Sequence, residues 1–465
     1  MLKRPLIDHV PVEKNTKKRM RCFYLSEPSL GDAFVWVGGA GVLTTLRGVG
    51  DLGVFLKRLP RNFKAMMVRT SVANFVVNMN PYNYIYVVAF GATGTELGIL
   101  NSVGLALTAI FAALTGWIAD RRDQKKVFLL GAAAGVIVPV IYAISPGWGW
   151  LSLAFLVSGV ANGVIQPSWT AMWANAVSNR GRGTVYGLAN VFTIAPLLFA
   201  SLIGGAIVSA SGGLTVAGIR PVYWVQAALL VAVWLFIWRI LKPPRPSSIP
   251  SGLSLNKMLT DYREVFSIKG VRSWVLMKSL GSVSIGMADP FWMLYASVVL
   301  HASVMTMAYM VAARSLAQVV LSPLSGRMTD AVGRKRMIIG GRMIMYVATA
   351  IFLFAGGGWA LIPAWVLMGV NDATNIAWSA EECELVQRHQ RARMTALSNA
   401  AFNALAVPAS ILGGFLWDRV SPAAPFVLMV FIDGCIRMPI VHRFVPESME
   451  VPGSSDEADA GPFTD

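Results

Sequence analysis

Three ionisable residues interrupt apolar segments in the second half of the chain: Asp289, Arg314 and Asp372. Each lies near the middle of a stretch long enough to cross a bilayer, where an unpaired charge costs at least ~2.5 kcal/mol. We therefore expect Arg314 to pair with one or both carboxylates. Two acids and one arginine leave one carboxylate that could take up a proton, as proton-coupled transport requires. A static structural ion pair explains the same three residues equally well.

A second titratable group, residues 381–384 together with His389, contains side chains that can ligate metals. The neighbouring Arg388 and Arg391 explain its acids more simply as members of an ion-pair network. We therefore expect no metal site at this position.

The rest of the sequence lacks the patterns that catalysis needs. It has no Gly-rich phosphate loop, so ATP is not expected to drive the protein. Its three cysteines suggest no disulfide framework, and its four histidines are scattered. We predict no catalytic residue and no cofactor. The alternative of a membrane enzyme acting on lipids would need His, Asp or Glu clustered at a membrane face.

Composition places these groups in a membrane protein. The chain has 465 residues, of which 55% are hydrophobic and 14% are charged, whereas soluble domains carry roughly a quarter charged residues. The net charge of +16 does not indicate nucleic-acid binding, because the basic residues lie between apolar runs and not on one compact face.

Twelve apolar stretches approach the length of about 20 residues that crosses a hydrocarbon core. Lys and Arg gather in the connections after the second, fourth, eighth and tenth stretches, and such residues favour the cytoplasmic side. We therefore predict an all-α integral membrane protein with twelve transmembrane helices and both termini in the cytoplasm. The stretches lie near 66–90, 97–119, 127–145, 150–175, 184–210, 221–241, 273–300, 304–325, 337–355, 360–380, 394–416 and 424–444.

The two halves of the chain repeat each other at an offset of about 210 residues. Asn80-Pro81 matches Asp289-Pro290, and Gly204-Gly205 matches Gly413-Gly414. Six spans per repeat give both halves the same orientation, which predicts an axis along the membrane normal and a binding site between the halves.

Two loops at this offset resemble the signature loop of the major facilitator superfamily. The first runs from Gly116 to Lys126, with Asp120 followed by Arg121, and the second runs from Gly326 to Arg336. Asp123 stands where the first loop should have glycine, and the second loop lacks a basic residue directly after Asp330. The resemblance implies a secondary transporter built from two six-helix repeats. The loop residues that match or accompany the motif are Gly116, Asp120, Arg121, Gly326, Asp330, Gly333 and Arg334.

The resemblance also implies roles for the loop acids and for polar residues inside the spans. Asp120 and Asp330 are expected to hold the cytoplasmic side closed, although the same charges could serve only to fix topology. In this fold the segments 66–90, 150–175, 273–300 and 360–380 line a central cavity, which suits an organic solute, although interhelical hydrogen bonds explain each amide singly. The cavity candidates are Asn78, Asn80, Tyr86, Asn162, Gln166, Trp169, Trp292, Tyr295, Asn375 and Trp378.

A weaker resemblance concerns exporters, in which two spans carry Gly-Pro followed by Gly-Gly. Here Ala195-Pro196 precedes Gly204-Gly205, without the first glycine. This pattern and the aromatic content favour efflux over nutrient uptake. Asp433 and Arg437 lie four residues apart and are expected to pair on a span that faces lipid.

The sequence predicts a function and a division of the chain into five parts. The function predicted from it is alternating-access transport of a small organic solute, with proton-coupled drug or metabolite efflux as the leading form. A nutrient uptake carrier and a non-transporting solute receptor remain alternatives; we expect a monomer in a lipid bilayer, in the cell membrane. The parts are a basic cytoplasmic tail at 1–65, a six-helix bundle at 66–241, a linker with an amphipathic helix at 242–272, a second bundle at 273–444, and an acidic disordered tail at 445–465.

Overall fold

The computed structural model describes residues 33–36, 43–46, 59–119, 123–175, 192–242, 263–268, 270–386 and 391–444. The chain divides into two units, Met1–Leu59 and Pro60–Asp465. In the first unit, β1 (Ala33–Trp36) and β2 (Leu43–Leu46) form an antiparallel pair in which Ala33 lies opposite Leu46. Aromatic and β-branched residues suit these strands. The described part of the predicted 1–65 tail thus contains a short hairpin that the sequence patterns did not indicate.

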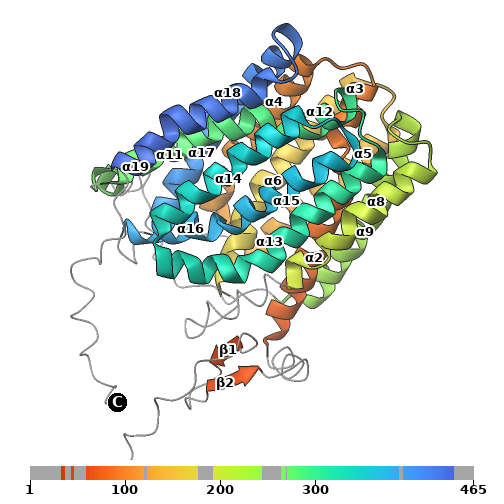
Figure 1. The fold of residues 1–465 in the computed structure, drawn as a ribbon. Coiled ribbons are helices and arrows are strands. Elements are labelled where there is room, and N and C mark those ends of the chain that lie inside the picture. The colour runs from red at the N-terminus through yellow and green to blue at the C-terminus, as the bar shows by residue number, and fades with distance from the viewer. Residues whose placement is uncertain are drawn as a thin grey trace, which may run out of the picture. The chain divides into compact units, whose positions relative to one another are not determined.

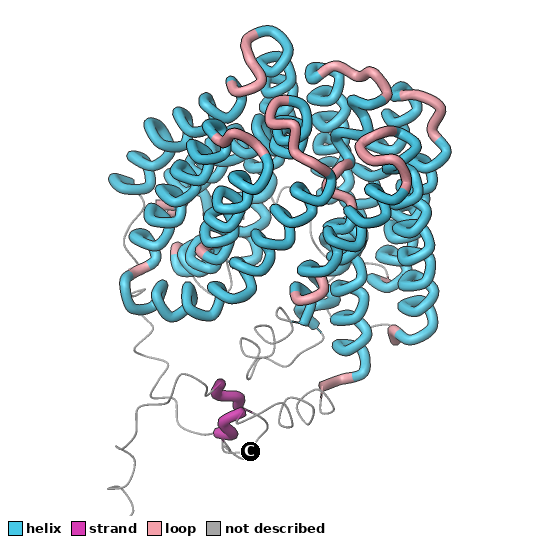
Figure 2. The backbone as a smooth tube through the Cα atoms, turned by 45° about the vertical axis from the view of Figure 1, so that its right-hand side comes forward, coloured by secondary structure: helices cyan, strands magenta, loops and turns pink. Residues whose placement is uncertain are grey.

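The second unit is a bundle of helices that run alongside one another, joined by loops at their ends (Figures 1 and 2). Its first half contains α2 (Arg61–Met79), α3 (Asn83–Ala89), α4 (Gly94–Ala119), α5 (Gln124–Ile144), α6 (Trp148–Asn175), α8 (Leu197–Ala210) and α9 (Val216–Ile240). Its second half contains α11 (Val271–Ala288), η1 (Asp289–Phe291), α12 (Trp292–Val298), α13 (Val304–Val332), α14 (Arg334–Phe354), η2 (Gly358–Ala360), α15 (Leu361–Ala373), α16 (Asn375–Glu384), α17 (Arg391–Arg419), α18 (Ala424–Phe431), η4 (Ile432–Arg437) and α19 (Met438–Phe444).

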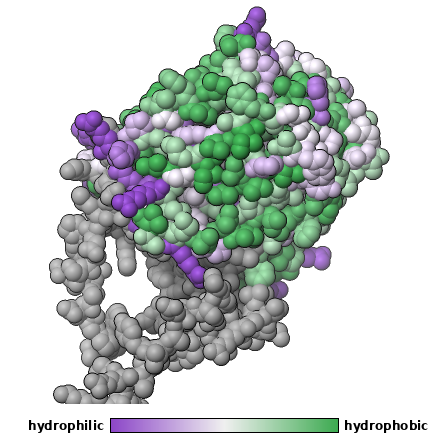
Figure 3. Space-filling model, in the orientation of Figure 1, coloured by the Kyte–Doolittle hydropathy of each residue, from purple (hydrophilic) through white to green (hydrophobic). Residues whose placement is uncertain are grey.

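Nine helices in the described residues are long and apolar enough to cross a membrane. Figure 3 shows hydrophobic side chains spread broadly over one face of this unit, with hydrophilic residues toward its margins. Large apolar side chains such as Leu130, Phe199 and Phe354 are exposed, as expected where the solvent is lipid. Of the predicted linker helix, only 263–267 lies among the described residues and is helical.

The other three apolar stretches coincide with interrupted helices. The stretch near 66–90 is α2 followed by α3, with Asn80-Pro81 between them, and the stretch near 273–300 is α11 and α12 joined by η1, which contains Pro290. Proline lacks a backbone N–H and breaks helical hydrogen bonding, which explains both breaks. Because Pro81 and Pro290 occupy repeat-related positions, the breaks do so too. The stretch near 360–380 breaks at Thr374, between α15 and α16.

Close backbone approaches also follow the repeat. A Cβ added to Gly204 on α8 would overlap the carbonyl oxygen of Met79, the last residue of α2. A Cβ added to Gly413 on α17 would overlap the carbonyl oxygen of Met287, near the end of α11. Each glycine therefore lets one helix pack directly against another just before that helix breaks.

Hydrogen bonds between the halves gather at one end of the bundle, the end away from the signature loops, which we call the distal end. Ser102 Oγ donates to the Val407 carbonyl at 2.5 Å, linking α4 to α17. Ser201 Oγ donates to the Ala308 carbonyl at 3.0 Å, linking α8 to α13.

Asp433 is the centre of a buried charge network that includes its predicted pair with Arg437. Asp433 is 0% exposed and accepts from Arg437 Nη1 at 2.7 Å, Arg342 Nε at 2.7 Å and the Tyr346 hydroxyl at 2.6 Å. Arg437 also donates Nε to the Met277 carbonyl at 3.0 Å. The prediction that Asp433 pairs with Arg437 is confirmed, but the pair points into the second bundle because α11 and α14 supply its remaining partners.

Removing Asp433 should destabilise the protein strongly. Asp433→Ala leaves two buried guanidinium groups without their shared carboxylate, and breaking a buried pair in this way costs about 3–5 kcal/mol. The measurement is unfolding in detergent micelles. As a control, Glu96→Gln at the exposed start of α4 should cost about 1 kcal/mol, the size of a helix cap. Equal losses for the two variants would contradict a structural role for the network.

Candidate functional site

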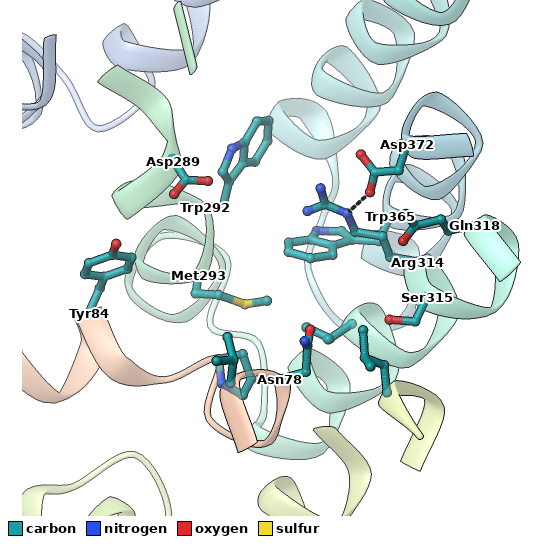
Figure 4. Close-up of a pocket in the computed structure, with 14 residues that line it drawn as sticks. Asn78, Tyr84, Asp289, Trp292, Met293, Arg314, Ser315, Gln318, Trp365 and Asp372 are labelled. Carbon is teal, nitrogen blue, oxygen red and sulfur yellow. Dashed lines mark hydrogen bonds and ion pairs between the residues drawn. The ribbon is translucent and has the colours of Figure 1, made fainter. Parts of the chain in front are cut away.

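A cavity of about 350 Å³ lies between the two halves. Figure 4 shows its side chains converging from helices far apart in sequence. The first half supplies residues from α2, from the break after it, and from α3 and α8, while the second half supplies η1, α12, α13 and α15. The lining residues are Val77, Asn78, Pro81, Tyr84, Leu197, Asp289, Trp292, Met293, Val311, Arg314, Ser315, Gln318, Trp365 and Asp372.

One wall of the cavity carries an ion pair. Arg314 Nε donates to Asp372 Oδ2 at 2.6 Å. The pair joins α13 to α15, which pack closely because a Cβ at Gly369 would overlap the Arg314 carbonyl oxygen. Gly369 lies one turn before Asp372 on α15, so the same close approach brings the carboxylate to the arginine.

Asp289 lies on a different wall. It is the first residue of η1 and is exposed to the cavity. Its carboxylate makes no hydrogen bond or ion pair with the described residues. Its carboxylate lies near Tyr84 and Trp292, and the Arg314 guanidinium points into the same space (Figure 4). Because Asp372 neutralises Arg314, the three residues together carry a net charge of −1 when all are ionised.

The remaining lining is aromatic and polar. Trp365 lies 5.5 Å from the Arg314 guanidinium carbon, measured to the ring centroid, and its buried Nε1 has no hydrogen-bond partner in the described part of the chain. Asn78 donates Nδ2 to the Asn74 carbonyl at 2.9 Å and so keeps its side-chain oxygen available. Aromatic faces, one unpaired carboxylate and a few hydrogen-bonding groups are the features of a binding site for an amphipathic solute.

Five predicted residues line this cavity together: Asn78, Asp289, Trp292, Arg314 and Asp372. The ion pair expected for Arg314 is present, with Asp372 as the partner.

The other predicted cavity residues do not line it. Tyr86 is buried and donates its hydroxyl to the Tyr142 carbonyl at 2.8 Å. Asn162, Gln166 and Asn375 are exposed. Asn80 is buried, and neither amide atom has a partner among the described residues.

Three predicted aromatic residues pack elsewhere in the bundles. Trp169 packs against Phe128 with ring centroids 4.9 Å apart, and Tyr295 packs against Phe426 at 5.4 Å. Trp378 lies 4.5 Å from the Arg437 guanidinium carbon, so it belongs to the buried network and not to the cavity.

Sequence reasoning missed four informative lining residues, Tyr84, Met293, Gln318 and Trp365. Helical spacing could have found two of them. Gln318 follows Arg314 by one turn, and Trp365 precedes Asp372 by two turns, so each shares a helix face with a charged residue.

The signature loops are described only in part. Asp120 and Arg121 lie outside the described residues, Gly116 lies on α4, and the side chain of Asp330 on α13 also lies outside them. Gly333 adopts a φ of 97° between α13 and α14, a conformation that favours glycine, and Arg334 begins α14.

Asp123, the departure from the first signature loop, has a structural explanation. It is the N-cap of α5, and its side chain accepts a hydrogen bond from Lys125 N at 3.0 Å. The first loop therefore starts its following helix with a capping carboxylate, where the second loop uses Gly333.

The family relationship follows from a comparison of the whole helical unit. The family model of the Major Facilitator Superfamily matches residues 65–301 and 275–436. The chain belongs to this superfamily. It is therefore a multi-pass membrane transporter and not an enzyme.

Several curated proteins and solved structures are similar to this superfamily member. The multidrug resistance protein MdtG of Yersinia enterocolitica is 25% identical over 322 residues, covering 63% of this chain and 74% of that protein. The probable vesicular acetylcholine transporter-B of Danio rerio is 29% identical over 146 residues, covering 30% of this chain and 29% of that protein. The crystal structure of the nucleoside transporter NupG superposes with a TM-score of 0.63 at 13% identity, covering 82% of this chain and 98% of that one.

The cavity geometry predicts unequal coupling between Arg314 and the two acids. In double-mutant cycles built with Arg314→Gln, Asp372→Asn and Asp289→Asn, the 314–372 pair should show an interaction energy of about 0.5–3 kcal/mol because its side chains are in contact. The 314–289 pair should show less. Unfolding of the purified variants in micelles gives both values, and a larger value for the 314–289 pair would contradict the pairing described above.

Proposed function

We propose that this protein is a secondary active transporter that exports small amphipathic organic cations by alternating access. The observation that carries the proposal is the cavity between the halves, in which the Asp289 carboxylate makes no hydrogen bond or ion pair with the described residues while Arg314 is paired with Asp372. A monovalent cation or a proton would neutralise Asp289. The two would therefore compete for one carboxylate, which is the basis of proton-coupled exchange.

The proposed topology has twelve spans with both termini in the cytoplasm. Support comes from the nine described helices that are long and apolar enough to cross a membrane and from the three stretches that are divided into shorter helices, which together occupy all twelve apolar stretches. The basic residues of the signature loops favour the cytoplasmic side for that end. Because the halves join at the distal end, we infer that this arrangement admits solute from the cytoplasmic side.

The aromatic lining supports the cationic substrate class. A cation positioned over the face of tryptophan or tyrosine gains about 0.5–2 kcal/mol, and Trp292, Trp365 and Tyr84 all line the cavity. The relative named as a probable vesicular acetylcholine transporter supports this class, because acetylcholine is an organic cation, and the relative named as a multidrug resistance protein supports an organic solute. Asp120 and Asp330 remain proposed gating residues at the signature-loop end.

Proton movement tests the coupling step. Purified protein is placed in liposomes that contain a pH-sensitive dye, and organic cations are added one at a time. We expect a cation to move protons, and we expect Asp289→Asn to abolish that signal because it removes the carboxylate that binds the proton. Asp372→Asn should reduce the signal without abolishing it. Solute binding without any proton movement would instead favour a uniporter or a receptor.

Substrate charge tests the binding step separately. Tetraphenylphosphonium, a cation, and tetraphenylborate, an anion of the same shape, are compared by equilibrium binding in micelles. The protein should prefer the cation, and Asp289→Asn should weaken cation binding by about 1–4 kcal/mol, the Coulombic attraction of two unit charges about 4 Å apart at an effective dielectric constant between about 80 and 20. The matched variant Gln318→Leu, which removes a polar lining residue without changing charge, should alter the two affinities equally. An unchanged cation preference in Asp289→Asn would contradict the assignment.

A further inference from the structure

Asp418 crosses the interface between the halves at the distal end. It lies near the end of α17, in the second half, and its carboxylate meets the start of α4, in the first half. Oδ1 accepts from Gly94 N at 3.0 Å, and Oδ2 accepts from Thr95 N at 2.7 Å and from Thr95 Oγ1 at 2.6 Å. Both oxygens of this exposed carboxylate thus accept hydrogen bonds from the opposite half.

Helix α4 leaves two backbone donors open for this contact. Thr93 and Glu96 form a capping box: Thr93 Oγ1 accepts from Glu96 N at 3.2 Å, and Glu96 Oε2 accepts from Thr93 N at 2.8 Å. That box leaves the N–H groups of Gly94 and Thr95 without an intrahelical partner. Asp418 accepts both of them, and its negative charge faces the positive end of the α4 dipole.

Small residues bring the two helices close enough for the contact. A Cβ at Gly94 would meet Trp417 and Asp418, and a Cβ at Gly414 would overlap the Gly94 carbonyl oxygen. One turn further along α4, a Cβ at Gly98 would overlap the Ser410 carbonyl oxygen. The approach of α17 to α4 therefore depends on glycine at three positions around the carboxylate.

The contact has no counterpart at the repeat-related position. The offset that relates Gly413-Gly414 to Gly204-Gly205 relates Asp418 to Ser209. The start of α13, which corresponds to the start of α4, is capped by its own Ser303, whose Oγ accepts from Thr306 N at 3.1 Å. The halves meet where α4 packs against α17 and where α8 packs against α13. In the described residues, only the first of these interfaces has a carboxylate that accepts from the start of a helix.

We propose that Asp418 is a latch that holds the distal end of the transporter closed and sets the balance between its two access states. The inference rests on the alternating-access function proposed above. When the halves rock so that the distal end opens, the start of α4 must separate from the end of α17, and all three hydrogen bonds break together. A contact present in one state and absent in the other shifts the equilibrium by its own free energy.

The latch predicts a shift in conformational population that needs no substrate. Spin labels are attached to cysteines introduced at Gly149 and Gly356, one in each half at the distal end, where an added Cβ meets nothing within 4 Å. Cys22, Cys383 and Cys435 are first replaced by serine. Asp418→Asn should raise the ratio of distal-open to distal-closed protein about tenfold in the distance distribution, a typical coupling between states.

Two further variants separate a latch from a general loss of stability. Glu96→Gln removes a carboxylate from the same helix end, but among the described residues that carboxylate hydrogen-bonds to Thr93 in its own half, so the distance distribution should not change. Thr95→Val should give a smaller shift than Asp418→Asn, and the double variant should equal Asp418→Asn alone, since both act on one contact.

The outcomes are decisive in both directions. An unchanged distribution in Asp418→Asn, or an equal shift in Glu96→Gln, would overturn the latch. The distance measurement uses protein in lipid nanodiscs without solute. If the protein fails to transport cations, the distance distribution still tests whether Asp418 holds the distal end closed. Conversely, transport that is retained in liposomes with an altered distribution in Asp418→Asn would support both proposals.

Discussion

Pairing of charge inside an apolar bundle is the constraint on which this structure depends most. A charged group that leaves water must find a partner or a polar cavity, and the described charges inside the second bundle do so in different ways. Asp433 binds two arginines, and Lys278 binds Glu382 at 2.5 Å. Asp289 instead faces the polar cavity, where its carboxylate makes no hydrogen bond or ion pair with the described residues. The proposed function assigns the binding of a proton or a cation to this carboxylate.

Interrupted helices place the Asp289 carboxylate between the halves. Ideal helices through 66–90 and 273–300 would satisfy their own backbone and leave no irregular turn at the cavity. Pro81 and Pro290 prevent this, and the break after Ala288 sets Asp289 at the start of η1, beside the cavity. Gly204 and Gly413 then pack against the carbonyls before the breaks, so the same residues that interrupt the helices also fix where the broken ends lie.

Hydropathy and the repeat were enough to predict the helical architecture, because both are properties of residue type and spacing. They also indicated Asp289, Arg314 and Asp372, since a charged residue within an apolar stretch can be found from the sequence alone. Which acid pairs with Arg314 was not predictable, because it depends on the packing of α15 against α13 at Gly369. The buried position of Asp433 was missed for a related reason: its partners Arg342 and Tyr346 lie on a different helix, α14. The sequence did not indicate the contact made by Asp418, since an acid at the end of a span is indistinguishable from an ordinary surface residue.

The two halves contribute different chemistry despite their shared fold. Where the second half has Asp289 and Asp372, the repeat-related positions of the first half carry the neutral amides Asn80 and Asn162. The ion pair and the Asp289 carboxylate therefore both belong to the second half, whereas the first half lines the cavity with neutral residues. Rocking of the halves would leave the positions of Asp289, Arg314 and Asp372 relative to one another unchanged. It would change only the residues of the first half that lie opposite them. In such a design the binding chemistry stays constant through the cycle, and contacts between the halves, such as the one made by Asp418, decide which side of the membrane reaches it.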